Sequence, residues 1–202
     1  MGKRMNKKLF LLSIPTLLAP YIAIFTLAVV FLSTKVKLFE AIMESIFQND
    51  GLLLIAALII YLLLTIALGI ACFFISTFKF CDALSTAKTA MLIKLIQIPA
   101  YIMIFVLGVA MTIAILTIPF TIALFWIDCL CLFLTSLPVI SSIICAVRHG
   151  TMKFQEVIWV IILQFVFCAD VVASIIYCKK LKGLANKPEE ASAEILKGTN
   201  FN

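Results

Sequence analysis

Two carboxylates lie inside apolar stretches of the sequence, where a charged group needs an explanation. Asp128 is the single formal charge within residues 95–147, and Asp170 interrupts the apolar stretch at residues 157–178. A charge in the hydrocarbon core of a membrane costs at least about 2.5 kcal/mol on insertion scales, so each acid needs a partner or a proton. The pair therefore predicts a polar site at membrane depth.

Other polar residues recur at helical spacing around these acids. Residues three or four positions apart lie on one face of a helix, so each set forms a stripe. The three stripes are expected to converge on one interior. The candidate polar site comprises Asp128, Cys131 and Thr135 on one span, Asp170 and Ser174 on the next, and Gln97 and Tyr101 on the preceding one.

The two acids are expected at a common depth. The chain turns near residue 150, with Asp128 about 22 positions before the turn and Asp170 about 20 after it. At roughly 1.5 Å per residue their depths would differ by only about 3 Å, provided that the two spans are antiparallel neighbours.

Two interpretations of this site stay open. It can be a hydrated cavity or a proton or cation path that uses the two aspartates as titratable groups. Alternatively, its members hydrogen-bond across helices and hold the bundle together. The second is favoured, because no cation is expected at the depth of the acids and no ladder of charges crosses the membrane.

No enzymatic or metal-binding signature is recognisable. The sequence lacks a Gly-x-Ser-x-Gly elbow, a His-Glu-x-x-His helix and a phosphate-binding loop. Its one histidine, His149, belongs to a predicted turn. A thiolate and carboxylate metal site could gather Asp128, Cys129, Cys131, Cys168 and Asp170. Against it, Cys129 and Cys131 face different directions on a helix. We expect no catalytic residue, cofactor or metal.

The composition identifies the solvent of most of the chain as lipid. Of 202 residues, 64% are hydrophobic and 13% are charged, with a mean hydropathy of +1.22. A soluble domain of this size could not bury so much apolar surface. The net charge of +6 comes from basic clusters between apolar runs, which is typical of membrane topology rather than nucleic-acid binding. The seven cysteines lie mostly in apolar runs, so a disulfide framework is not expected.

The expected fold is an all-α polytopic membrane bundle in one domain, residues 1–182. An amphipathic pattern at residues 36–48 predicts an interfacial helix, and Pro119 predicts a turn at residues 116–121. Thr65 and Gly69 have the spacing that lets helices approach closely. Residues 183–202 read as a polar, flexible tail in which Pro188 could start one short helix. The five expected spans cover residues 9–33, 52–76, 95–116, 121–146 and 157–178.

The first span contains Pro15 and Pro20, which should bend it and leave carbonyl groups that need a hydroxyl or a neighbouring helix as partner. Five spans with the N-terminus in the cytoplasm place nine basic residues inside and seven outside. The basic cluster at residues 179–182 favours a cytoplasmic C-terminus instead, which needs an even number of spans or a re-entrant segment.

Three segments resemble a family of small multi-pass bacterial membrane proteins that has no assigned function. They are the stretch Ile98-Pro99-Ala100-Tyr101 with Phe105 and Gly108, the segment around Asp128, and residues 164–171. The resemblance covers about residues 95–182. It implies a bacterial cytoplasmic membrane and carries no activity, substrate or cofactor.

The expected role is that of a non-enzymatic accessory or interaction protein in this membrane. Its partners would be the lipid bilayer and either another membrane protein or further copies of the chain. The alternative role is a small proton- or cation-coupled transporter or channel that uses Asp128 and Asp170.

Overall fold

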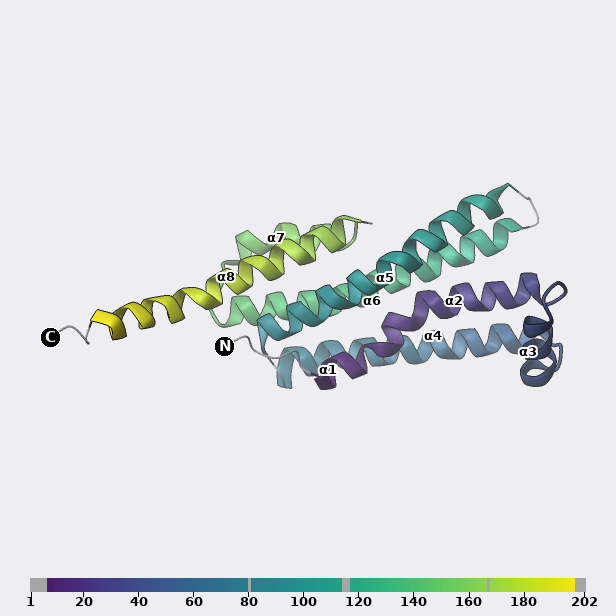
Figure 1. Ribbon diagram of the computed structural model, residues 1–202, viewed down its shortest axis with the longest axis horizontal. Helices are drawn as coiled ribbons and strands as arrows, with labels where there is room; N and C mark the ends of the chain where they lie inside the picture. The colour runs from purple at the N-terminus through teal and green to yellow at the C-terminus, as the bar shows by residue number, and fades with distance from the viewer. Residues whose placement is uncertain (1–6, 80, 114–116, 167, 199–202) are drawn as a thin grey trace.

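The computed structural model describes residues 7–79, 81–113, 117–166 and 168–198, with side chains over residues 9–185 of these ranges. All elements in this part of the chain are helices, as expected for an all-α bundle. In order they are α1 (Lys7–Leu12), α2 (Ile14–Leu32), α3 (Lys37–Phe47), α4 (Gly51–Phe74), the π-helix η1 (Ile75–Lys79), α5 (Ala83–Thr112), α6 (Ile118–Arg148), α7 (Phe154–Leu163) and α8 (Ala169–Gly198). Their arrangement is shown in Figure 1.

Four stretches of the described chain are long and apolar enough to cross a membrane: Leu9–Leu32, Gly51–Lys79, Ala83–Thr112 and Ile118–Arg148. They correspond to the first four expected spans. The third begins earlier than predicted, because the residues around Lys88 continue helix α5 rather than forming a polar connection. The protein is therefore a helical membrane protein with at least these four spans.

The predicted fifth span, residues 157–178, is not one helix. It is divided into α7 and α8, with a break between Leu163 and Ala169 at which Cys168 has a positive φ of 66°. The two helices form a hairpin, so α8 returns toward the end of the bundle from which α7 started (Figure 1).

The open end of the hairpin carries an ion pair of 2.7 Å between Lys180 and Glu156. The hydrogen bond from the Lys180 ammonium holds the pKa of the Glu156 carboxyl below its usual value.

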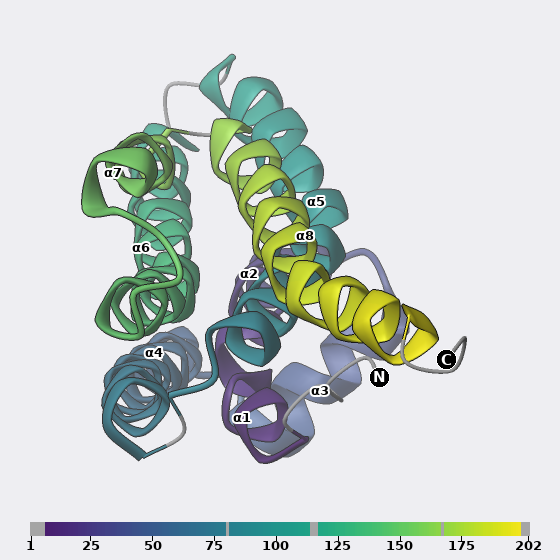
Figure 2. The same ribbon diagram turned by 90° about the vertical axis from the view of Figure 1, so that its left-hand side faces the viewer.

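Helix α6 is the centre of the bundle. Fourteen of its residues are buried, against four in α4. Viewed along the bundle, α4 and α6 lie on one side and α2 and α5 on the other, with α8 beside α5 and α7 beside α6 (Figure 2). Gly69 makes the contact of α4 with α6 possible, since a Cβ there would lie 2.9 Å from Leu134 Cδ2. Thr65, one turn earlier, is also buried, which confirms the predicted close-packing face.

The prolines of the first span act as predicted. The helix is interrupted at Ser13, whose hydroxyl donates to the Leu9 carbonyl at 2.9 Å. Pro20 has no N–H for the carbonyl of Thr16, four residues earlier. That carbonyl accepts instead from Gln97 Nε2 of α5, at 2.8 Å. A neighbouring helix therefore supplies the partner that the proline removes.

The remaining local predictions have mixed outcomes. The amphipathic segment at residues 36–48 forms α3, which ends at Gln48 in the left-handed conformation and buries none of its residues. The predicted turn at residues 116–121 is displaced: α6 begins at Ile118 with Pro119 in its first turn, and residues 114–116 lie outside the described residues. The predicted tail from residue 183 is helical over most of its length, because α8 continues through Pro188 to Gly198.

Candidate functional site: an intramembrane polar cluster

An ion pair between α5 and α8 lies at the centre of the polar interior. Lys94 Nζ is 2.9 Å from Asp170 Oδ2, and both side chains are buried, with Lys94 wholly inaccessible to solvent. The same ammonium donates to Gln164 Oε1 at 2.5 Å. The expectation that no cation lies at the depth of the acids is therefore wrong for Asp170.

The sequence contains a signal for Lys94. It lies three residues before Gln97 and seven before Tyr101, so it continues the polar stripe of α5 by one further step. Apolar residues flank it on both sides, with Met91, Leu92 and Ile93 before it and Leu95 and Ile96 after it. Here the helix begins at Ala83, eleven residues earlier, and carries the ammonium into the bundle.

Gln164 stabilises the break between α7 and α8. Its side-chain nitrogen donates to Ser174 Oγ at 3.2 Å, and its backbone carbonyl accepts from Ser136 Oγ of α6 at 3.1 Å. Ser174 also donates to the carbonyl of Asp170 at 2.7 Å. Non-helical backbone at membrane depth is tolerated only where protein or water satisfies its polar groups. These contacts meet that requirement at the tip of the hairpin.

Tyr101 and Thr135 bring the α5 and α6 stripes together. The Tyr101 hydroxyl donates to Gln97 Oε1 at 3.1 Å and also lies against the Thr135 side chain. Thr135 donates to the backbone carbonyl of Cys131 at 2.9 Å. Asp128, Cys131 and Asp170 all lie within electrostatic range of the Tyr101 hydroxyl. The seven predicted residues are therefore gathered in one region, together with Lys94 and Gln164.

Asp128 and Asp170 belong to the same cluster, and Asp170 lies within electrostatic range of Asp128. The common depth predicted for them required a continuous fifth span running antiparallel to α6. The chain instead has a break between Leu163 and Ala169, so Asp170 lies at the start of a helix that runs toward the α6 C-terminus. The spacing on which the prediction depended is therefore absent.

Asp128 differs from Asp170 in its partners. Its Oδ1 is the one buried side-chain nitrogen or oxygen among the described residues that has no hydrogen-bond partner. Asp170 lies within electrostatic range of it, but Lys94 is bonded to Asp170. An unpaired carboxylate in a low-dielectric interior is costly unless it takes up a proton. Asp128 is therefore the acid of the cluster whose Oδ1 has no hydrogen-bond partner, whereas Asp170 is paired with Lys94.

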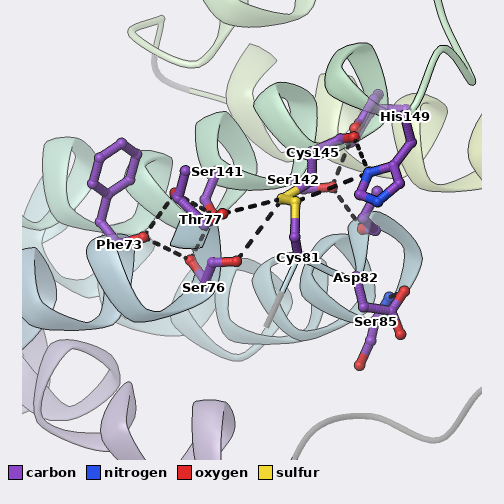
Figure 3. The surroundings of a disulfide bond; sticks show 12 residues. Phe73, Ser76, Thr77, Cys81, Asp82, Ser85, Ser141, Ser142, Cys145 and His149 are labelled. Carbon is purple, nitrogen blue, oxygen red and sulfur yellow. Dashed lines mark hydrogen bonds between the residues drawn. A yellow bond between two sulfur atoms is a disulfide. The ribbon is translucent and has the colours of Figure 1, made fainter. Parts of the chain in front are cut away.

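A second polar region lies near the start of α5 and joins it to α6 (Figure 3). Cys81 and Cys145 form a disulfide across 64 positions of sequence, with their Cα atoms 5.5 Å apart. Ser141 accepts from Thr77 at 2.8 Å, and Ser142 donates to the Ala83 carbonyl at 2.6 Å. His149, the predicted turn residue, lies beside this bond with Nδ1 2.8 Å from the Cys145 carbonyl. The sequence did not lead us to expect a disulfide, so this bond corrects that expectation for Cys81 and Cys145.

Thiol counting tests the disulfide. Alkylation of the denatured, unreduced protein is expected to modify five of the seven cysteines, because Cys81 and Cys145 are bonded and the other five are free. Treatment with a reductant before alkylation should raise the count to seven by intact-mass spectrometry. The Cys81→Ser variant provides the control, with six thiols modified in either condition. Seven modified thiols in the unreduced native sequence would contradict the bond.

Metal ligands do not gather in the described part of the chain: no group of three or more His, Cys, Asp or Glu side chains is placed to hold an ion. Cys168 is exposed, while Cys131 is buried in the bundle. Comparison of the chain with models of protein families, with curated proteins and with solved structures gives no match. The geometry of the polar cluster is therefore the basis on which a function can be inferred.

Proposed function

We propose that the protein is a non-enzymatic accessory or interaction protein of a bacterial cytoplasmic membrane. The observation that carries the proposal is the Lys94–Asp170 pair, whose charges are directed at each other and at Gln164. Buried ion pairs that are fully hydrogen-bonded serve packing and specificity, and a helix hairpin held by one is a structural element. The proposed task of the cluster is to hold α7 and α8 against the bundle.

The distribution of basic residues supports a cytoplasmic location for the end of the bundle where α5 starts and α6 finishes. Seven basic side chains of the described region lie there, whereas Lys35 and Lys37 lie near the opposite end, beside α3. Basic residues near span ends are retained in the cytoplasm. The Cys81–Cys145 disulfide lies at the same end and argues for the opposite side, because disulfides are rare in reducing compartments. We follow the basic residues, which are the more numerous signal. With four spans and a hairpin, both termini are then proposed to be cytoplasmic. The seven residues are Lys79, Lys88, Arg148, Lys153, Lys179, Lys180 and Lys182.

The outward face of α4 is the proposed contact surface for another membrane protein or a second copy of the chain. Of the four spans, α4 has the fewest buried residues, and Ile59, Ile60 and Leu63 on it are more than half exposed. Photo-crosslinking from Ile59 in intact membranes should yield a discrete protein adduct. The same probe at buried Leu134 is the control and should react only within the chain. Lipid adducts alone from Ile59 would contradict the proposal.

One observation favours a second role as a proton- or cation-coupled transporter, namely the unpaired Oδ1 of buried Asp128. A titratable group without a partner inside a membrane is typical of proton pathways. In the accessory role Asp128 carries no flux, and the Asp128→Asn variant should leave folding and crosslinking unchanged.

Reconstituted vesicles distinguish the two roles. Under the accessory proposal, vesicles with the wild-type protein should dissipate an imposed pH gradient no faster than protein-free vesicles, and Asp128→Asn should change nothing. The Asp50→Asn variant is a matched control, since it removes a carboxylate at the α4 N-cap while keeping a capping side chain. Proton flux that disappears in Asp128→Asn but persists in Asp50→Asn would overturn the accessory role and establish transport.

A further inference from the structure

A groove between α5 and α8 lies outside the polar cluster and next to the basic end of the bundle. It has a volume of about 590 Å³, within the range of about 300–1,000 Å³ that is common for ligand sites. Each helix contributes one face, with lining residues at spacings of three, four and seven. They are Lys88, Met91, Leu92 and Leu95 on α5, and Ile175, Cys178, Lys179 and Lys182 on α8.

The wall of the groove is almost wholly apolar, and the three lysines that border it lie toward one end. Lys88 is the first lining residue of α5, and Lys182 is the last of α8, so both lie at the end where α5 starts and the hairpin opens. Both lysines lie within electrostatic range of Cys178, which places them on either side of the same opening. The residues farther from that end, such as Leu95 and Ile175, are apolar. The lining contains three cations and no acid.

From this arrangement we infer that the groove binds one anionic phospholipid of the adjacent leaflet. An acyl chain occupies the apolar part between Leu92 and Ile175, and the phosphate is held by Lys88, Lys179 and Lys182. Basic pockets between helices at the cytoplasmic surface recognise anionic head groups in this way, and each lysine near the surface contributes enough attraction for about a fivefold preference. The matching positions of the cations and the apolar wall identify the ligand as an amphiphile rather than a free anion.

This site has a structural consequence for the hairpin. The groove is formed by the same two helices that Lys94 and Asp170 join deeper in the membrane. A bound lipid would therefore fill the space between α5 and α8 on the side of the ion pair where the hairpin opens. The inference does not depend on the proposed role of the protein.

Lipid enrichment in nanodiscs tests the inference. The full-length protein is reconstituted in an equal mixture of phosphatidylglycerol and phosphatidylcholine, and the lipids that remain bound after detergent extraction are quantified by native mass spectrometry. Wild-type protein should retain one phosphatidylglycerol preferentially. The double variant Lys88→Gln, Lys182→Gln should reduce this enrichment by at least about fivefold.

Two further variants separate a built site from general surface charge. Arg148→Gln with Lys153→Gln removes two cations from the same end of the bundle, outside the groove, and should leave the enrichment intact. Leu92→Trp fills the apolar part without changing charge and should displace the lipid. Equal losses in both double variants, or full retention of phosphatidylglycerol in Leu92→Trp, would overturn the inference.

Discussion

Replacement of Lys94 by methionine is expected to cost about 3–5 kcal/mol of unfolding free energy, which is the usual cost of removing one partner from a buried ion pair. Methionine keeps the length and the apolar stem of lysine, so packing changes little. The loss comes from Asp170, whose carboxylate would stay buried without its cation, and from Gln164, whose side-chain oxygen would lose its ammonium donor. The hairpin of α7 and α8 should detach from the bundle first.

A double variant distinguishes this electrostatic explanation from simple loss of packing. Lys94→Met combined with Asp170→Leu removes both charges, and such apolar replacements of buried pairs are often neutral or stabilising. We expect the double variant to recover most of the stability that Lys94→Met loses, as measured by reversible unfolding in mixed micelles. If the two losses are simply additive, the pair does not account for the effect.

The exposed pair at the open end of the hairpin is the matched control. Lys180→Met breaks the 2.7 Å contact with Glu156, but both side chains are more than two-fifths exposed. Water and salt replace such a contact, so no measurable loss of stability is expected. A loss similar to that of Lys94→Met would show that any contact of the hairpin, rather than the buried pair, limits stability.

Several features of the cluster were predictable because they depend on helical periodicity. The stripes through Gln97 and Tyr101, and through Cys131 and Thr135, need only a spacing of three and four residues and a helix to carry them. It was also predictable that the carbonyl freed by Pro20 bonds to a hydroxyl or a neighbouring helix, because hydrocarbon contains no water that could donate to this carbonyl. The sequence could not name that partner as Gln97, because the pairing depends on how α2 packs on α5.

The hairpin was not predictable from periodicity. Residues 157–178 have the length and apolar content of a span, and no proline or glycine within them marks a break. At the break after Leu163, Ser136 of α6 donates to the Gln164 carbonyl, and the Gln164 side chain bonds Ser174 of α8. The same applies to the Cys81–Cys145 bond, whose partners are 64 positions apart. Such features are properties of tertiary packing.

The hairpin also resolves the conflict in charge distribution within the sequence. A continuous fifth span places Lys179, Lys180 and Lys182 across the membrane from the other basic clusters. When α8 turns back, these lysines lie at the same end as Lys88 and Arg148 (Figure 1). With five spans, nine basic residues lie on one side of the membrane and seven on the other. With the hairpin, most basic residues lie on one side, which agrees with the positive-inside rule.

A reporter fused after Asn202 is therefore expected on the cytoplasmic side of the membrane. Green fluorescent protein at this position should fluoresce, and alkaline phosphatase should be inactive, because the phosphatase needs an oxidising compartment for its disulfides. Fusions truncated after Asn49, between α3 and α4, are the internal control and should give the opposite pair of signals. The change in enzyme activity between the two fusion sites should be nearly all-or-none. Active phosphatase after both Asn49 and Asn202 would mean that residues 157–178 cross the membrane, and the Lys94–Asp170 contact at the tip of a hairpin would then be excluded.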